Sequence, residues 1–179
     1  MKKLLFSVSF IFGFIVSSSV SAQSLNLHRG SMTAGGEISY SSVKTIPDQG
    51  ESTTQSLLII SPSFGYFISP NFAFTGQITY AESLSAYDKI GLSAGLKFVQ
   101  PILNLYIFVD MQSGFGRLRG NNGADDINQF SLIAKGGVLY PFNRYVALET
   151  GIKMQYDFNG DAADQMTISF GYFGLSAFF

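Results

Sequence analysis

Hydrophobic and polar residues alternate with a period of two along most of the chain after residue 22. From Met32 one parity reads Met, Ala, Gly, Ile and Tyr, and the other reads Thr, Gly, Glu, Ser and Ser. The segment from Phe72 to Ala81 repeats this pattern. Successive side chains of a strand point to opposite faces. Each such segment is therefore predicted to be a β-strand with one apolar face and one small or polar face.

Turn signals divide the chain into eight segments of this kind. Short connections that contain Pro and Asn (residues 69–71, 101–104 and 141–144) alternate with longer polar stretches (residues 44–53, 82–88, 117–128 and 157–164). The strands are expected to be about ten to thirteen residues long; ten residues rise about 33 Å and, when tilted, cover the roughly 25 Å apolar band of a membrane barrel. The pattern predicts an all-β fold, an eight-stranded antiparallel transmembrane β-barrel, closed because lipid offers no partner to an open edge.

Alternation alone does not say which face points outward, since a soluble lipocalin-like barrel has its apolar face inside. Aromatic residues nevertheless bracket the apolar parity at two heights, as interfacial girdles do. Tyr40, Tyr80, Phe130 and Tyr156 lie beside the long connections, and Tyr66, Phe72, Phe98, Tyr140 and Phe179 beside the short turns or the chain end. The chain also lacks tryptophan, which lipocalin-like proteins usually carry near their start. We therefore expect the apolar parity to face lipid.

The opposite parity carries nearly all the charge of the predicted strands. It contains three acids and three bases: Glu37, Lys97, Asp110, Lys135, Glu149 and Lys153. The interior of an eight-stranded barrel is only wide enough to be filled by side chains, and buried charges must be paired. The expected result is a salt-bridge network that closes the lumen. A narrow polar conduit or an ion-gated pore is the alternative.

The N-terminus has the features of a secretory signal peptide. Lys2 and Lys3 precede an apolar run, and Val20-Ser21-Ala22 forms a small-x-small cleavage site. The run is too short for a membrane anchor. We expect a signal peptide at residues 1–22, a periplasmic tail at 23–29 and the barrel at 30–179. Loss of the two lysines leaves nine basic and twelve acidic residues, net −3, which argues against a nucleic-acid partner.

Candidate chemistry is sparse. There is no cysteine, and the single histidine, His28, lies before the first strand, so we expect no enzyme, no metal site and no cofactor. Residues 157–161 faintly resemble a calcium loop, but the glycine is misplaced and a tight hairpin turn fits better. Arg117 and Arg119, beside the outer rim, are either solvated or in contact with lipid phosphates.

The alternating strands, the Val-Ser-Ala signal ending and the hairpins at residues 65–73 and 145–149 resemble the small outer-membrane β-barrel proteins of the OmpA-barrel, OmpX and OmpW type. The resemblance covers residues 30–179. It implies a monomer in the bacterial outer membrane, with both termini periplasmic and a structural or surface-interaction role through its external loops. A small-solute channel of the OmpW kind is the alternative. The implied partners are outer-membrane lipid and lipopolysaccharide.

The last strand resembles the signal by which the barrel assembly machinery recognises its substrate proteins. This resemblance implies the assembly machinery and periplasmic chaperones as partners during biogenesis. The matching positions are Phe173, Leu175, Ala177 and Phe179. Higher in the same strand the apolar residues Met166, Ile168 and Phe170 have the opposite parity. A bulge near Gly171 is therefore expected; otherwise Phe178 faces lipid and Phe179 lies at the rim.

Overall fold

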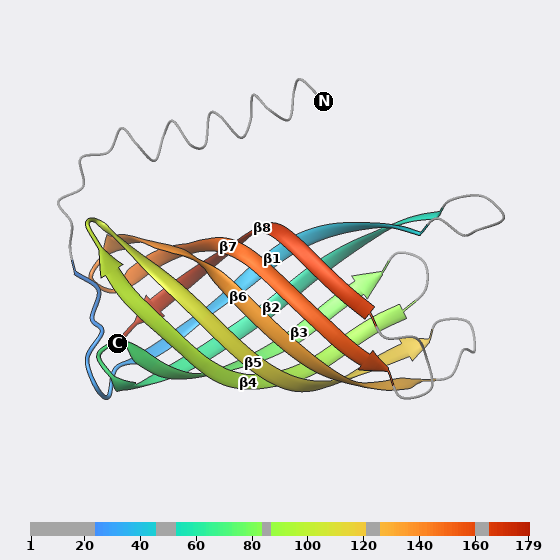
Figure 1. Cartoon of the computed structure of the whole chain (residues 1–179), viewed down its shortest axis with the longest axis horizontal. Helices are drawn as coiled ribbons and strands as arrows, with labels where there is room; N and C mark the ends of the chain where they lie inside the picture. The colour runs from blue at the N-terminus through green and yellow to red at the C-terminus, as the bar shows by residue number, and fades with distance from the viewer. Residues whose placement is uncertain (1–23, 46–52, 84–86, 121–125, 160–164) are drawn as a thin grey trace, which may run out of the picture.

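Eight antiparallel strands close into a barrel in chain order in the computed structural model (Figure 1). The structure describes residues 24–45, 53–83, 87–120, 126–159 and 165–179. The predicted signal peptide, residues 1–22, lies outside this part, as do much of each long connection and Gly160 of the predicted hairpin. The strands are β1 Met32–Thr45, β2 Thr53–Ser69, β3 Phe72–Ser83, β4 Tyr87–Ile102, β5 Leu105–Gly120, β6 Ile127–Asn143, β7 Val146–Asn159 and β8 Gln165–Phe178.

The strands are longer, and the short turns tighter, than the sequence predicted. They contain 12 to 17 residues, so the estimate of about ten to thirteen was wrong. Two of the predicted turn prolines lie within strands: Pro101 pairs with Tyr106, and Pro141 pairs with Ala147 beside a register shift. Both stand within three residues of a strand end, where the missing N–H of proline is tolerated.

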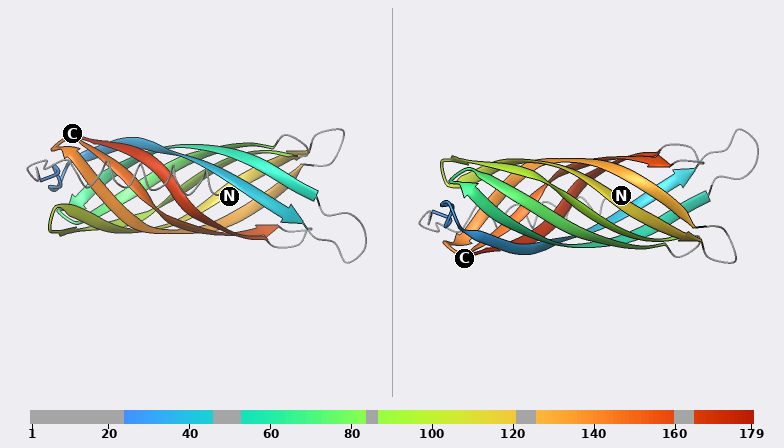
Figure 2. Two further views of the ribbon diagram at one scale, coloured as in Figure 1. Left: turned by 90° about the horizontal axis from the view of Figure 1, so that it is seen from above. Right: turned by 90° about the horizontal axis from the view of Figure 1, so that it is seen from below.

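The strands are inclined to the long axis of the barrel, which Figure 2 shows from two opposite sides. The short turns, the chain end and residues 24–31 gather at one end, and the strand ends that border the long connections lie at the other (Figure 1). The part of the chain that is described contains no helix long and apolar enough to cross a membrane.

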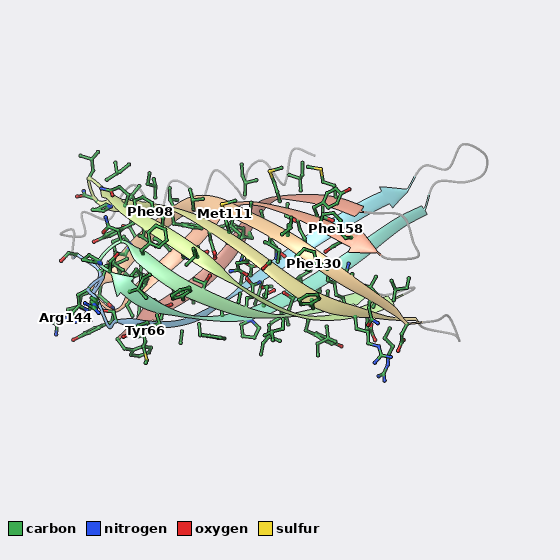
Figure 3. The ribbon with its side chains drawn as sticks, turned by 60° about the horizontal axis from the view of Figure 1, so that its bottom comes forward. Tyr66, Phe98, Met111, Phe130, Arg144 and Phe158 are labelled. Carbon is green, nitrogen blue, oxygen red and sulfur yellow. The ribbon has the colours of Figure 1, made fainter. Side chains whose placement is uncertain are left out.

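The outward parity is apolar around the circumference of the barrel (Figure 3). Leu92, Met111, Leu132, Met154 and Phe173 are exposed on five successive strands. An apolar surface of this extent is far larger than the patches that soluble monomers expose. The exterior therefore has the polarity of a surface in contact with hydrocarbon, as the girdle pattern predicted.

The last strand changes parity through a bulge, as the sequence predicted. The pairing of β7 with β8 shifts between Gly151 and Ile152, and the residue left out of the ladder is Gly171, with a φ of 81°. A positive φ suits glycine because other residues meet a steric clash there. Below the bulge Phe178 is buried inside the barrel and Phe179 is exposed, so the alternative with Phe178 facing lipid is wrong.

The seam that closes the barrel is the shortest of the ladders. The pairs between β1 and β8 run from Thr33–Phe178 to Ile38–Phe173, extended by two backbone hydrogen bonds between Met32 and Phe179. By contrast, β4 and β5 pair from Tyr87 to Ile102. The seam therefore joins only the half of each strand nearest the short turns.

Candidate functional site in the barrel interior

Glu37 of β1 is the centre of the largest ion-pair cluster in the interior. Its carboxylate lies 2.9 Å from Lys135 Nζ on β6 and 2.7 Å from Lys153 Nζ on β7. The two lysines are register partners, and all three side chains are at least nine-tenths buried. One carboxylate thus holds two buried ammonium groups, each of which needs a partner to compensate its lost hydration.

Gln77 of β3 completes this cluster. Its Nε2 donates to Glu37 Oε1 at 3.2 Å, and its Oε1 accepts a hydrogen bond from Lys135. The side chain is fully buried. The amide supplies a donor to the acid and an acceptor to the base, so it offsets the shortage of negative charge around the two lysines.

A second ion pair lies nearer the short turns. Lys97 of β4 donates to Glu149 Oε2 of β7 at 2.5 Å, and the Tyr172 hydroxyl donates to Glu149 Oε1 at 2.9 Å. The Lys97 ammonium also lies 4.3 Å from the centre of the Phe108 ring. This pair borders an apolar cluster, so a lone charge here would have little water to compensate it.

Asp110 of β5 differs from the expectation that all six predicted charges would pair. Among the described residues it forms no ion pair; it accepts hydrogen bonds from Thr75 at 3.1 Å and from Gln112 at 2.8 Å. Its register partners are Lys97 and Lys135. Their long side chains extend instead to Glu149 and Glu37, which leaves neutral donors to satisfy Asp110.

A third ion pair, which the sequence analysis missed, lies nearer the long connections. Lys89 Nζ is 3.2 Å from Asp157 Oδ2, and Gln155 and Ser131 also donate to this carboxylate. Asp157 was assigned to an outer loop, but it lies in β7 and is buried. Its parity was the available signal, because it follows Lys153 and Gln155 at steps of two.

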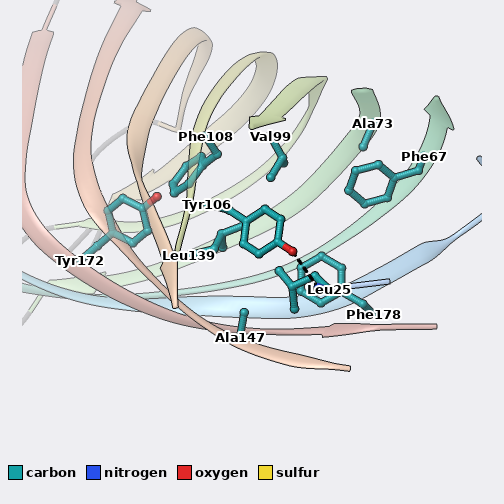
Figure 4. Close-up of a cluster of buried hydrophobic side chains, with 10 residues drawn as sticks. All are labelled: Leu25, Phe67, Ala73, Val99, Tyr106, Phe108, Leu139, Ala147, Tyr172 and Phe178. Carbon is teal, nitrogen blue, oxygen red and sulfur yellow. Dashed lines mark hydrogen bonds between the residues drawn. The ribbon is translucent and has the colours of Figure 1, made fainter. Parts of the chain in front are cut away.

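The interior at the short-turn end is filled by apolar side chains rather than charges (Figure 4). The cluster consists of Leu25, Phe67, Ala73, Val99, Tyr106, Phe108, Leu139, Ala147, Tyr172 and Phe178. Leu139 and Ala147 are completely inaccessible. Side chains therefore occupy the interior at two levels, a charged one and an apolar one nearer the short turns.

The expected periplasmic tail is folded against the barrel mouth. Residues 24–31, which we call the strap, place Leu25 in the apolar cluster, and the Leu25 N–H donates to the Tyr106 hydroxyl at 2.9 Å (Figure 4). The Asn26 N–H donates to the Arg144 carbonyl at 3.0 Å. His28, in the strap, hydrogen-bonds the hydroxyl of Ser31. The tail has two leucines, Leu25 and Leu27, among polar residues, which was too weak a signal to predict this contact from sequence.

The girdle residues lie at the two ends of the outer face. Tyr66, Phe72, Phe98, Tyr80 and Tyr156 are exposed, whereas Phe130 and Tyr140 are half-buried. The side chain of Tyr40 lies outside the described residues. Three further aromatic residues that the sequence pattern did not predict as girdle members are Phe115, Phe158 and Phe142, whose rings pack on Phe130 and Tyr140. Figure 3 shows Phe98 towards the short-turn end, and Phe130 and Phe158 towards the other.

The four positions of the proposed assembly signal lie between the bulge and the end of the chain. They belong to the parity that faces outward there. Phe173, Leu175 and Phe179 are exposed, and Ala177 is half-buried. The bulge at Gly171 allows these four residues to face outward, because it reverses the parity that β8 has between Gln165 and Phe170.

The same fold occurs in solved outer-membrane proteins of low sequence identity. The N-terminal β-barrel domain of Pseudomonas aeruginosa OprF matches with a TM-score of 0.59 and 12% identity, over 84% of this chain and 98% of that one. Neisserial surface protein A (NspA) matches with a TM-score of 0.58 and 16% identity, over 82% and 94%. Ail, the attachment invasion locus protein of Yersinia pestis, matches with 0.50 and 13%, over 84% and 99%.

No protein-family profile matches the sequence, and no curated protein matches it. The closed eight-stranded barrel with its apolar exterior is consistent with the likeness to these structures. The chain therefore has the fold of the small outer-membrane β-barrel proteins.

Proposed function

We propose that the protein is an integral outer-membrane barrel whose lumen is closed by its own side chains and whose role is structural, with surface contacts made by its external loops. The observation that supports this proposal is that side chains occupy the interior at two levels. Glu37, Lys135 and Lys153 fill one level, and the apolar cluster around Phe67 and Leu139 fills the level below. Two different kinds of packing must be removed before solute passes.

The proposal includes a topology and a set of partners. The strap and the chain end lie at the end with short turns (Figure 1), and short turns are periplasmic in bacterial barrels. Both termini then lie in the periplasm, and the long connections contact lipopolysaccharide or neighbouring cells. The same proposal includes export by a signal peptide. It also includes folding with the help of periplasmic chaperones and the barrel assembly machinery. The folded protein is proposed to be a monomer without catalytic activity.

A small-solute channel is the second candidate, and one observation favours it. A cavity of about 30 Å³, the volume of one water molecule, lies among Glu37, Asp110, Glu149, Lys97 and Lys135. The charged level therefore has room for a water molecule beside its ion pairs.

Single-channel recording in planar bilayers separates the two candidates. We expect the purified protein to insert without steady openings, since the apolar cluster remains closed even if ion pairs exchange. The matched variant is Lys135→Ala, which removes one cation from the charged level only and is expected to stay closed. Steady openings in the natural protein whose conductance changes in Lys135→Ala would reject the closed barrel and establish the channel.

A further inference from the structure

We propose that the end of the barrel with the short turns carries a binding surface for the headgroup of an anionic phospholipid. This surface, the short-turn rim, consists of Arg29, Leu103, Phe142, Arg144, Tyr145 and Phe179. The proposal rests on the membrane location proposed above, but not on which side of the membrane the rim faces. It is carried by the combination of two unpaired cations with exposed apolar side chains.

The apolar part of the rim stands at the tips of the turns. Leu103, at the β4–β5 turn, is 98% exposed, and its φ of 54° directs the chain sharply between the two strands. Phe142, Tyr145 and Phe179 are also exposed. Residues at such tips are normally polar, because they stand in water. Their apolar character indicates that this end lies within the membrane interface, where aromatic and aliphatic groups meet headgroups.

The charged side chains of the rim are all basic in the described residues. Arg29 and Arg144 are exposed, and neither forms an ion pair there, the terminal carboxylate of Phe179 included. The acids of the adjoining strands, Asp110 and Glu149, point into the lumen and are engaged there.

The opposite rim provides a contrast. There Arg117 is neutralised by Asp126 at 2.8 Å, and Asp88 lies opposite Arg119 in the register of β4 and β5. The side chains of the short-turn rim therefore carry a net positive charge, and an anionic partner complements it.

Both arginines are carried by backbone that is held in place. Asn143 Oδ1 accepts hydrogen bonds from the Tyr145 and Val146 N–H groups, at 2.7 and 2.9 Å, which fixes the β6–β7 turn. On that turn the Arg144 guanidinium lies 4.6 Å from the centre of the Tyr145 ring, and Figure 3 shows it at the extreme end of the barrel. Arg29 is part of the strap, which the Asn26 N–H ties to the Arg144 carbonyl.

The chemistry of the rim selects among anionic partners. A guanidinium group binds phosphate through two parallel hydrogen bonds, and an anionic phospholipid places its phosphate within reach of apolar side chains that contact its acyl chains. An acidic soluble peptide would satisfy the arginines but would leave Leu103 and Phe142 in water. The rim therefore fits the lipid and not the peptide.

The test compares phosphatidylglycerol with phosphatidylcholine, which differ in net charge. The full chain is reconstituted into nanodiscs of an equal mixture, and the lipids retained after extraction into detergent are counted by native mass spectrometry. We expect phosphatidylglycerol to be retained over phosphatidylcholine. In the Arg29→Gln/Arg144→Gln double variant the preference should fall by roughly fivefold for each arginine.

Arg119→Gln, which removes an exposed arginine from the opposite rim, is the matched control and should retain the preference. Equal retention of the two lipids by the natural chain would overturn the proposal, and so would an equal loss in Arg119→Gln or displacement of the lipid by soluble polyglutamate. Circular dichroism confirms that each variant is folded. In a nanodisc the lipid surrounds both rims equally, so this experiment does not depend on which rim is periplasmic. The proposed topology is tested separately, by protease accessibility of the loops on intact cells.

Discussion

At the scale of single residues, the interior distributes its charges unequally. Glu37 holds two lysines, Glu149 and Asp157 hold one each, and Asp110 is held by neutral donors. The four acids and four lysines balance only when the whole interior is considered. Substitution of Glu37 is therefore expected to lower the free energy of unfolding most, because it leaves two buried cations without their ion partner.

Replacing Glu37 by alanine is expected to destabilise the barrel by roughly 3–5 kcal/mol, the usual cost of removing one partner of a buried ion pair. Lys135 would keep its hydrogen bond to Gln77, and Lys153 would lose its ion pair with Glu37. Glu149→Ala should cost less than Glu37→Ala, since it leaves one lysine unpaired instead of two. Urea unfolding in lipid vesicles, followed by gel mobility because the chain has no tryptophan, measures the change.

The control for these variants is Arg117→Ala, which breaks the exposed pair with Asp126 and should cost about 0–1 kcal/mol. If Arg117→Ala and Glu37→Ala lowered the free energy of unfolding equally, the buried cluster would not be a distinct source of stability.

At the scale of elements, β8 depends on one glycine. Gly171 absorbs the extra residue of the bulge at a positive φ, with no atom within 4 Å of the place where a Cβ would stand. A side chain at this position therefore has room but meets backbone strain. Without the bulge, either Phe173 and Leu175 or Met166 and Ile168 would turn into the lumen, because a shift of one residue reverses every side chain.

Gly171→Val is therefore expected to destabilise the barrel by about 1–3 kcal/mol, the cost of holding a residue other than glycine in a sparsely populated region. Gly136→Ala is the matched control, since the added Cβ would meet only an ordinary contact at 3.8 Å and the φ there is not positive. Heat-modifiability on gels compares the two variants with the natural chain. Equal midpoints for Gly171→Val and Gly136→Ala would contradict the role of the bulge.

The strap is the other element whose attachment can be measured. Tyr106→Phe removes the hydroxyl that accepts the Leu25 N–H, and a buried donor without its acceptor costs about 1–3 kcal/mol. We expect faster hydrogen exchange at Leu25 and unchanged exchange in β4 and β5. Tyr66→Phe, an exposed tyrosine near the same end, should leave exchange at Leu25 as it is, and faster exchange there in both variants would show that the strap is not held by this bond.

At the scale of the whole molecule, the barrel inverts the polarity of a soluble protein. Its exterior carries exposed residues such as Ile38, Phe64 and Phe115, whereas Glu37, Lys135 and Lys153 are buried. We expect the purified chain to fold from urea only when detergent micelles or vesicles are present, and to aggregate without them. Circular dichroism and gel mobility after dilution into each medium test this, and a folded, dispersed protein in plain buffer would refute the lipid-facing exterior.

Much of this architecture could be predicted from sequence because it depends on local properties. The period of two, the alternation of short and long connections and the parity of the charges are readable one segment at a time. The change of parity between Ile168 and Phe173 predicted the bulge at Gly171. The strand ends were less predictable, because Pro101 and Pro141 are turn signals that the sheet accommodates near strand ends.

The sequence alone determined that this chain forms eight strands with a charged inner face and an apolar outer one, since alternation assigns a face to each side chain without reference to any other strand. The tertiary structure decided which charges meet. Glu37 and Lys153 stand 116 positions apart, and their side chains converge because closure brings β1, β6 and β7 around one narrow lumen. Closure likewise creates the mouth that Leu25 fills, and no local pattern contains that information.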